Sequence, residues 1–132
     1  MCLEIILSTK RELPAADFTE VRVGRCLPVS GMKGRYFYQV TANQCACDFI
    51  GGSNKKREAE AVTYRRALAD LIRAGQNLGG VRVLLRWTDD EGTQPVISHV
   101  DDAETFVADS EIYHRATGEP CLFEIPYAGE YA

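Results

Sequence analysis

The residues with the most chemical potential are the two thiols of the segment Cys45-Ala46-Cys47. Residues 45–50 are predicted to form a β-strand, the hairpin partner of a strand over residues 35–41. Residues two apart on a strand share a face, so both thiols would project together with Phe49. Two thiolates on one face supply half of a site for zinc or another soft metal. The alternative is that both cysteines only fill space beside Phe49, because free cysteine is among the most buried residue types.

Cys2 is the candidate third ligand of this metal site. If the first strand adjoins the 45–50 strand, Cys2, Cys45 and Cys47 can converge on one ion, with His99, His114 or water in the fourth position. The chain has five cysteines and no basic, apolar leader before Glu4, so neither a disulfide framework nor a signal peptide is expected. The expected location is the cytoplasm, where thiols stay reduced.

The acidic run Asp89-Asp90-Glu91 is the candidate partner-binding site. Residues 1–86 hold 14 of the 15 lysines and arginines with 8 acidic residues, whereas residues 87–132 hold Arg115 alone with 11 acidic residues. An acidic surface of this kind would suit a basic protein partner, for example a toxin blocked by an immunity protein. The ordinary alternative is an acidic turn beside Gly92, with the two halves of the chain neutralising each other. A pI of about 5.2 makes nonspecific nucleic-acid binding unexpected.

No catalytic constellation is visible, so a non-enzymatic protein is expected and no catalytic residue is assigned. Removal of the first methionine would expose Cys2 as a nucleophile, as in glutamine amidotransferases, but that family opens with Cys-Gly-Ile and this chain continues with Leu-Glu. The start of the long helix, Ser53-Asn54-Lys55-Lys56, is similar to the final helix of double-stranded RNA-binding domains. The first helix of such a domain is missing here, and an acid-rich segment follows.

These residues must be positioned by one domain over residues 1–132, the usual size for a single domain. A helix is expected from Lys55 to Ala74, capped by Ser53 or Asn54 and ended by Gly75. The other expected elements are strands over residues 2–8, 19–27, 35–41, 45–50, 81–87 and 95–100, a short helix over 101–106, and one or two strands within 111–126. This order predicts an α+β fold, an antiparallel sheet of about five to seven strands with one long helix packed on one face. No apolar run approaches the roughly 18 residues of a membrane helix, so no membrane partner is expected.

Over residues 1–106 the chain resembles an uncharacterised family of small bacterial proteins. Members of that family open with Met-Cys and carry a Cys-Gly-Cys-Gly-Phe-like strand, a long Arg/Leu helix, a strand ending in Trp and an Asp-Glu-Gly turn. The matching segments here are Met1-Cys2, Cys45-Ala46-Cys47-Asp48-Phe49, Arg66-Ala67-Leu68, Arg86-Trp87 and Asp90-Glu91-Gly92. Ala46 and Asp48 stand where the family has glycines. The resemblance implies an architecture and a link between the Met-Cys start and the Cys-x-Cys segment, and no activity.

Overall fold

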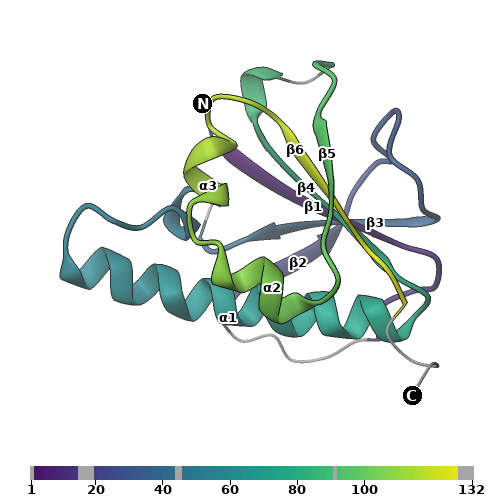
Figure 1. The fold of residues 1–132 in the computed structure, drawn as a ribbon, viewed down its shortest axis with the longest axis horizontal. Helices are drawn as coiled ribbons and strands as arrows, with labels where there is room; N and C mark the ends of the chain where they lie inside the picture. The colour runs from purple at the N-terminus through teal and green to yellow at the C-terminus, as the bar shows by residue number, and fades with distance from the viewer. Residues whose placement is uncertain (1, 15–19, 44–45, 91, 128–132) are drawn as a thin grey trace.

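The computed structural model describes residues 2–14, 20–43, 46–90 and 92–127, and these form one six-stranded sheet with helices on one side (Figure 1). The strands lie in the order β2-β3-β1-β4-β6-β5. They are β1 (Leu3–Thr9), β2 (Arg22–Arg25), β3 (Tyr36–Thr41), β4 (Val81–Trp87), β5 (Val96–His99) and β6 (Cys121–Ile125). The helices are α1 (Lys55–Asn77), α2 (Ala103–Ala108) and α3 (Ile112–Arg115), with short 3-10 helices η1 (Cys47–Phe49) and η2 (Thr88–Asp90). The α+β prediction is confirmed.

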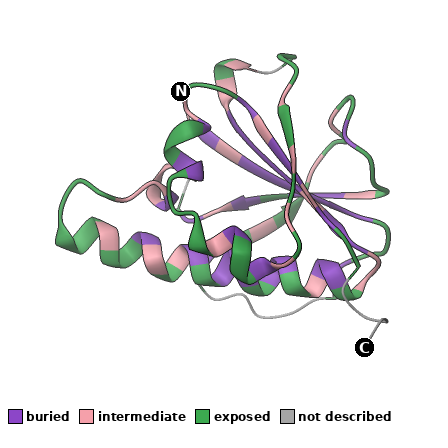
Figure 2. Cartoon of the chain, viewed as in Figure 1, coloured by how far each residue is buried: buried purple, intermediate pink, exposed green. Residues whose placement is uncertain are grey.

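Burial explains the order of the strands in the sheet. The central strands β1 and β4 are buried at nearly every position, whereas the edge strands β2 and β5 are largely exposed (Figure 2). A strand with apolar residues on both faces gains most from a central place, where both faces can be covered. Strand pairs are antiparallel except β5 and β6, which run parallel because α2 and α3 form the connection between them.

The long helix α1 begins where the sequence predicts. The side chain of Asn54 accepts a hydrogen bond from the backbone N–H of Arg57 at 2.9 Å, which satisfies one of the free donors of the first turn. The predicted end was wrong, since the helix continues past Gly75 to Asn77. A Cβ on Gly75 would lie 2.8 Å from the Cβ of Val81, so a glycine there lets the last turn of α1 approach the start of β4.

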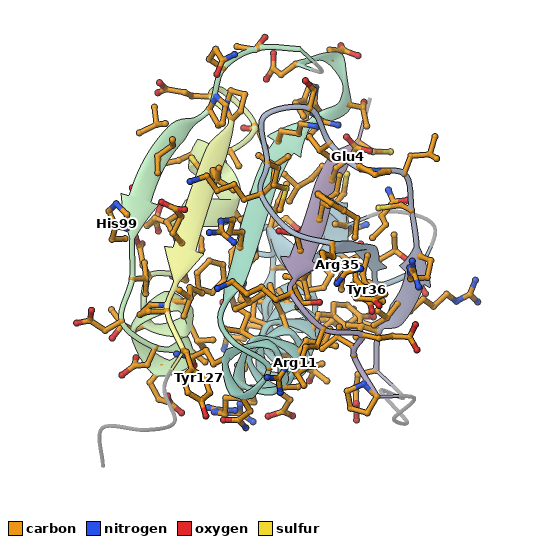
Figure 3. The ribbon with its side chains drawn as sticks, turned by 90° about the vertical axis from the view of Figure 1, so that its right-hand side faces the viewer. Glu4, Arg11, Arg35, Tyr36, His99 and Tyr127 are labelled. Atoms are coloured by element: carbon orange, nitrogen blue, oxygen red, sulfur yellow. The ribbon has the colours of Figure 1, made fainter. Side chains whose placement is uncertain are left out.

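The two faces of the sheet are covered to different extents. On one face the sheet packs against α1, α2 and α3 in the main core, which includes Leu3, Ile5, Leu7, Leu68, Leu71, Val83 and Leu85. The opposite, helix-free face carries a smaller core of Ile6, Met32, Phe37, Leu84 and Leu122. The segment between β2 and β3 supplies part of this cover and crosses in front of β1 (Figure 3). None of the described helices is both long and apolar enough to cross a lipid bilayer.

One predicted strand was wrong, and another has a neighbour that the sequence did not predict. Residues 47–49 form the 3-10 helix η1, which turns the chain toward α1 and buries Phe49 between Tyr64 and Tyr113, with ring centroids at 5.7 and 6.0 Å. Aromatic burial under the helix therefore outweighs the strand preference of this segment. The segment over 95–100 does form β5, but it pairs with β6 and does not return beside β4, because the more apolar β6 takes that central position.

The buried arginine of α1 holds η1 in place. Arg65 donates from Nε to the carbonyl of Phe49 at 2.8 Å and from Nη2 to the carbonyl of Ile50 at 2.6 Å. Its Nη1 bonds to Glu58 at 3.1 Å, and its guanidinium lies 5.1 Å from the centre of the Tyr113 ring. All three nitrogens are therefore used within the fold, as a buried charge requires.

Replacing Leu68 with alanine should lower the free energy of unfolding by about 2–5 kcal/mol, the range for a leucine in a well-packed core. Leu68 is fully buried between α1 and the sheet. Leu27, which is 86% exposed, provides the matched control, and Leu27→Ala should cost less than about 0.5 kcal/mol. Urea unfolding followed by Trp87 fluorescence measures both, and equal costs would show that the buried face of α1 is assigned wrongly.

Candidate functional site

The helix-free face of the sheet carries an ordered pattern of side chains. Strand alternation points every second residue to this face, and register brings Ile6 of β1, Leu84 of β4, Leu122 of β6 and Ile97 of β5 side by side. They form an apolar row across four strands. Figure 3 looks onto this face, with β5, β6, β4 and β1 next to one another.

A groove of about 580 Å³ opens over this row, and we call it the sheet-face groove. One wall is the segment between β2 and β3, including Leu27 and Met32, and the other is the segment that leads into β5. Leu84 and Leu122 are buried in its floor, whereas Leu27 and Ile97 are 86% and 57% exposed on its rims. A concave, mainly apolar site of this size is typical of small-molecule binding.

Two charged side chains lie in the groove. Glu4 of β1 stands opposite Arg86 of β4, and the Arg86 Nε donates to the Glu4 carboxylate at 3.0 Å. The Arg86 side chain is 11% exposed and that of Glu4 20% exposed. The pair therefore combines an apolar floor with a hydrogen-bonding group that water reaches only in part.

Cys26 lies in the same groove as a neutral thiol. Partial burial raises its pKa, and the nearby Glu4 carboxylate adds to the effect, while Arg25 and Arg86 act in the opposite direction. The thiolate is the nucleophilic form of cysteine, so a raised pKa lowers the reactivity of Cys26 at neutral pH. The groove is therefore suited to binding more than to covalent chemistry.

Tyr113 of α3 is a titratable group that burial perturbs strongly. Its ring is enclosed by Phe49 and Phe106, and its hydroxyl has no hydrogen-bond partner among the described residues. Burial raises its pKa well above the usual range of tyrosine, although Arg65 opposes the shift. Tyr113 therefore stays protonated and acts as a packing residue of the main core.

Sequence reasoning missed the sheet-face groove. The signal available was the presence of charged residues on two central strands, Glu4 on β1 and both Arg82 and Arg86 on β4, among apolar neighbours. A charge inside a buried strand needs a partner, and the pattern alone does not say that the two strands are adjacent or that a groove lies above them.

Of the thiols proposed as metal ligands, that of Cys47 lies close to the backbone beside Cys2. The N–H of Leu3 donates to the Sγ of Cys47 at 3.3 Å, and the N–H of Ala46 donates to the carbonyl of Leu3 at 3.2 Å. In a trans peptide, the N–H of a residue lies on the same side as the Cα of the residue before it. The Cys47 Sγ that accepts from the Leu3 N–H therefore lies near the Cα of Cys2. Cys45 lies outside the described residues. Among those residues, no three His, Cys, Asp or Glu side chains gather as a metal site, so the three-thiol site stays a prediction.

The two candidate fourth ligands lie in different places. His99 stands opposite Glu124, which pairs with Arg82 and through it with Ser8 of β1. Ser8 is six residues from Cys2, about 20 Å along an extended strand, so His99 cannot share an ion with Cys2. His114 lies exposed on α3, next to Tyr113, which contacts η1.

Cys47 also lines a second hollow of about 540 Å³ at the start of α1, with Asn43, Asp48, Lys56 and Arg57. Its walls are mostly polar, and Asn43 and Asp48 already hydrogen bond to each other at 2.8 Å. The sheet-face groove is the stronger candidate because its floor is apolar and buried, so a ligand there gains from leaving water.

The acidic residues predicted to meet a partner lie at the same end of the sheet as Cys2. The N–H of Thr88 donates to the carbonyl of Cys2 at 2.8 Å, which extends the β1–β4 pairing by one residue. Asp89 is exposed and Asp90 is partly exposed in η2, and Glu91 lies outside the described residues. Two ion pairs, Arg73–Glu104 and Arg82–Glu124, join the basic and acidic parts of the chain, so part of the charge asymmetry is neutralised internally.

Glu4→Gln should lower the free energy of unfolding by about 1–3 kcal/mol, because it removes a charge-assisted hydrogen bond from a mostly buried arginine. The matched control is Glu124→Gln, which breaks the Arg82–Glu124 pair on the same face of the sheet. That pair is more exposed, with side chains 21% and 29% accessible, so its loss should cost less than about 1 kcal/mol. Urea unfolding of both variants tests this order, and a larger cost for Glu124→Gln would contradict it.

In comparisons with known proteins, no family model, no curated protein and no solved structure matches this chain. The resemblance to the small bacterial family therefore stays a prediction, and function is inferred from the residues and their geometry.

Proposed function

We propose that this chain is a non-enzymatic, cytoplasmic binding domain that holds a small, mostly apolar ligand in the sheet-face groove. The observation that carries the proposal is an open groove of about 580 Å³ over a buried apolar floor, with the Glu4–Arg86 pair inside it. Small-ligand sites commonly combine such a floor with a few placed polar groups.

Exposed apolar side chains on the rims support the same proposal. Leu27 and Ile97 lie on opposite walls of the groove, at 86% and 57% exposure. A ligand lying between them would remove both from water, with a gain of roughly 25 cal/mol for each Å² of apolar surface covered. Of the groups near this ligand, the Cys26 thiol has a raised pKa and Arg86 cannot lose its proton, which favours binding without catalysis.

A second candidate function is metal binding through Cys2, Cys45 and Cys47, and one contact favours it. The hydrogen bond from the Leu3 N–H to the Cys47 Sγ brings the Cys47 thiol beside the residue that follows Cys2. Zinc with three thiolates and a histidine or water is the expected centre, and His114 is the histidine nearer to η1.

The groove proposal predicts that the neutral fluorescent probe N-phenyl-1-naphthylamine binds the protein. Ile97→Asp should weaken the binding of this probe by about tenfold, because a rim contact worth roughly 1.4 kcal/mol is lost. The matched control is Val96→Asp. Val96 is 49% exposed on the same strand, but alternation points it away from the groove, so its substitution should leave probe affinity unchanged within twofold.

Fluorescence titration gives both dissociation constants, and melting temperatures of the variants verify that each is folded. Equal weakening by both substitutions would show that the probe binds elsewhere. A failure of the probe to bind the unsubstituted chain would overturn the groove as a ligand site.

The metal proposal predicts near-stoichiometric zinc in protein purified without chelator and its loss in Cys47→Ser. Cys121→Ser is the control, since Cys121 lies on β6 and should leave the metal content unchanged. Added zinc should also raise the melting temperature of the metal-free protein, because a ligand that binds only the native state stabilises it. Elemental analysis and thermal unfolding measure these effects, and an unchanged melting temperature with no bound metal would exclude the site.

A further inference from the structure

We propose that the ligand of the sheet-face groove is a small amphipathic carboxylate, whose head group binds the free edge of the Arg86 guanidinium and whose apolar body lies on the Leu84–Leu122–Ile97 row. This inference rests on the proposed function and adds the chemical class of the ligand and its orientation.

The first step is the incomplete use of Arg86. A guanidinium has five N–H donors and no acceptor. Among the described residues, its recorded hydrogen bond is the one from Nε to Glu4, so the N–H groups of both terminal nitrogens remain for a ligand. Arg86 lines the groove while its side chain is only 11% exposed. A partly buried donor group of this kind gains most from an acceptor that replaces water.

Arg65 provides an internal comparison. It is the other buried arginine, and its Nε, Nη1 and Nη2 all bond to groups of the chain itself. In Arg65, which lies away from the groove, the chain thus supplies a partner for each nitrogen. Arg86 differs from Arg65 in this respect, and it lines the sheet-face groove.

The second step is the chemistry of the head group. Because Arg86 only donates, the polar end of the ligand must accept hydrogen bonds, and a carboxylate does so with two oxygens in the geometry of the guanidinium edge. Glu4 accepts from the Arg86 Nε with its Oε1, so an ammonium group would have only the remaining acceptor capacity of Glu4, whereas a carboxylate can use both terminal nitrogens of Arg86. An acceptor head is therefore favoured over a donor head.

The third step is the position of the apolar body. Arg86 and Leu84 lie two residues apart on the same face of β4, about 7 Å along the strand. From Leu84 the apolar row continues to Leu122 and then Ile97, about 10 Å across three strands at the usual strand spacing. A carboxylate with a medium-length apolar chain can satisfy both ends of this arrangement in one molecule.

The test compares decanoate, decanol and decylamine, which share one apolar body and differ in the head group. Isothermal titration calorimetry below the concentrations at which they form micelles should give decanoate the highest affinity, by at least about tenfold over decylamine. In the double variant Glu4→Gln/Arg86→Gln, which keeps an uncharged cross-strand pair, decanoate should lose this advantage. Decanol should bind the double variant as it binds the original chain, within about twofold.

The matched control is Arg82→Gln/Glu124→Gln, which neutralises the neighbouring cross-strand pair outside the groove and should leave decanoate binding unchanged. Melting temperatures show whether each variant is folded. Equal affinity of the three ligands, or no binding by any of them, would overturn the carboxylate assignment. Groove binding is decided separately by the Ile97→Asp and Val96→Asp comparison with the neutral probe, so the two proposals can fail independently.

Discussion

The antiparallel register between β1 and β4 is the constraint on which the rest of the molecule depends. It pairs the two strands from Leu3 opposite Trp87 to Thr9 opposite Val81, in the middle of the sheet. Because side chains alternate, this register sends one set of apolar residues into the main core and sets Glu4 opposite Arg86 on the other face. A shift by one residue would place the charges against α1 and the core residues on the open face, so burial fixes the register strongly.

The two faces of the sheet then have different roles. Three helices seal one face around a continuous core, and the buried Arg65 there is bonded within the fold. The other face has a small core covered partly by the segment between β2 and β3, and the remaining space is the sheet-face groove (Figure 3). The main core and the proposed ligand site thus lie on opposite sides of the same central strands.

The sequence predicted those elements whose pattern is local. The N-terminus of α1 follows from Asn54, whose short side chain caps the first turn. The long alternating patterns of β1 and β4 predict strands. Residues 47–49 were misassigned because the burial of Phe49 under α1 is a contact with Tyr64 and Tyr113, distant in sequence. A short apolar segment takes its conformation from such contacts more than from its own propensity.

The candidate site was likewise predicted only in those features that the local sequence determines. The sequence by itself determined which groups exist: the thiols, the acidic run, and a charged residue on each of two apolar strands. Only the tertiary structure decided that Glu4 and Arg86 face each other beside an apolar groove, and that His99 lies at the far end of the sheet from Cys2. The physical reason is that local periodicity sets the face on which a side chain lies, whereas strand order and register, set by burial over the whole chain, decide its neighbours.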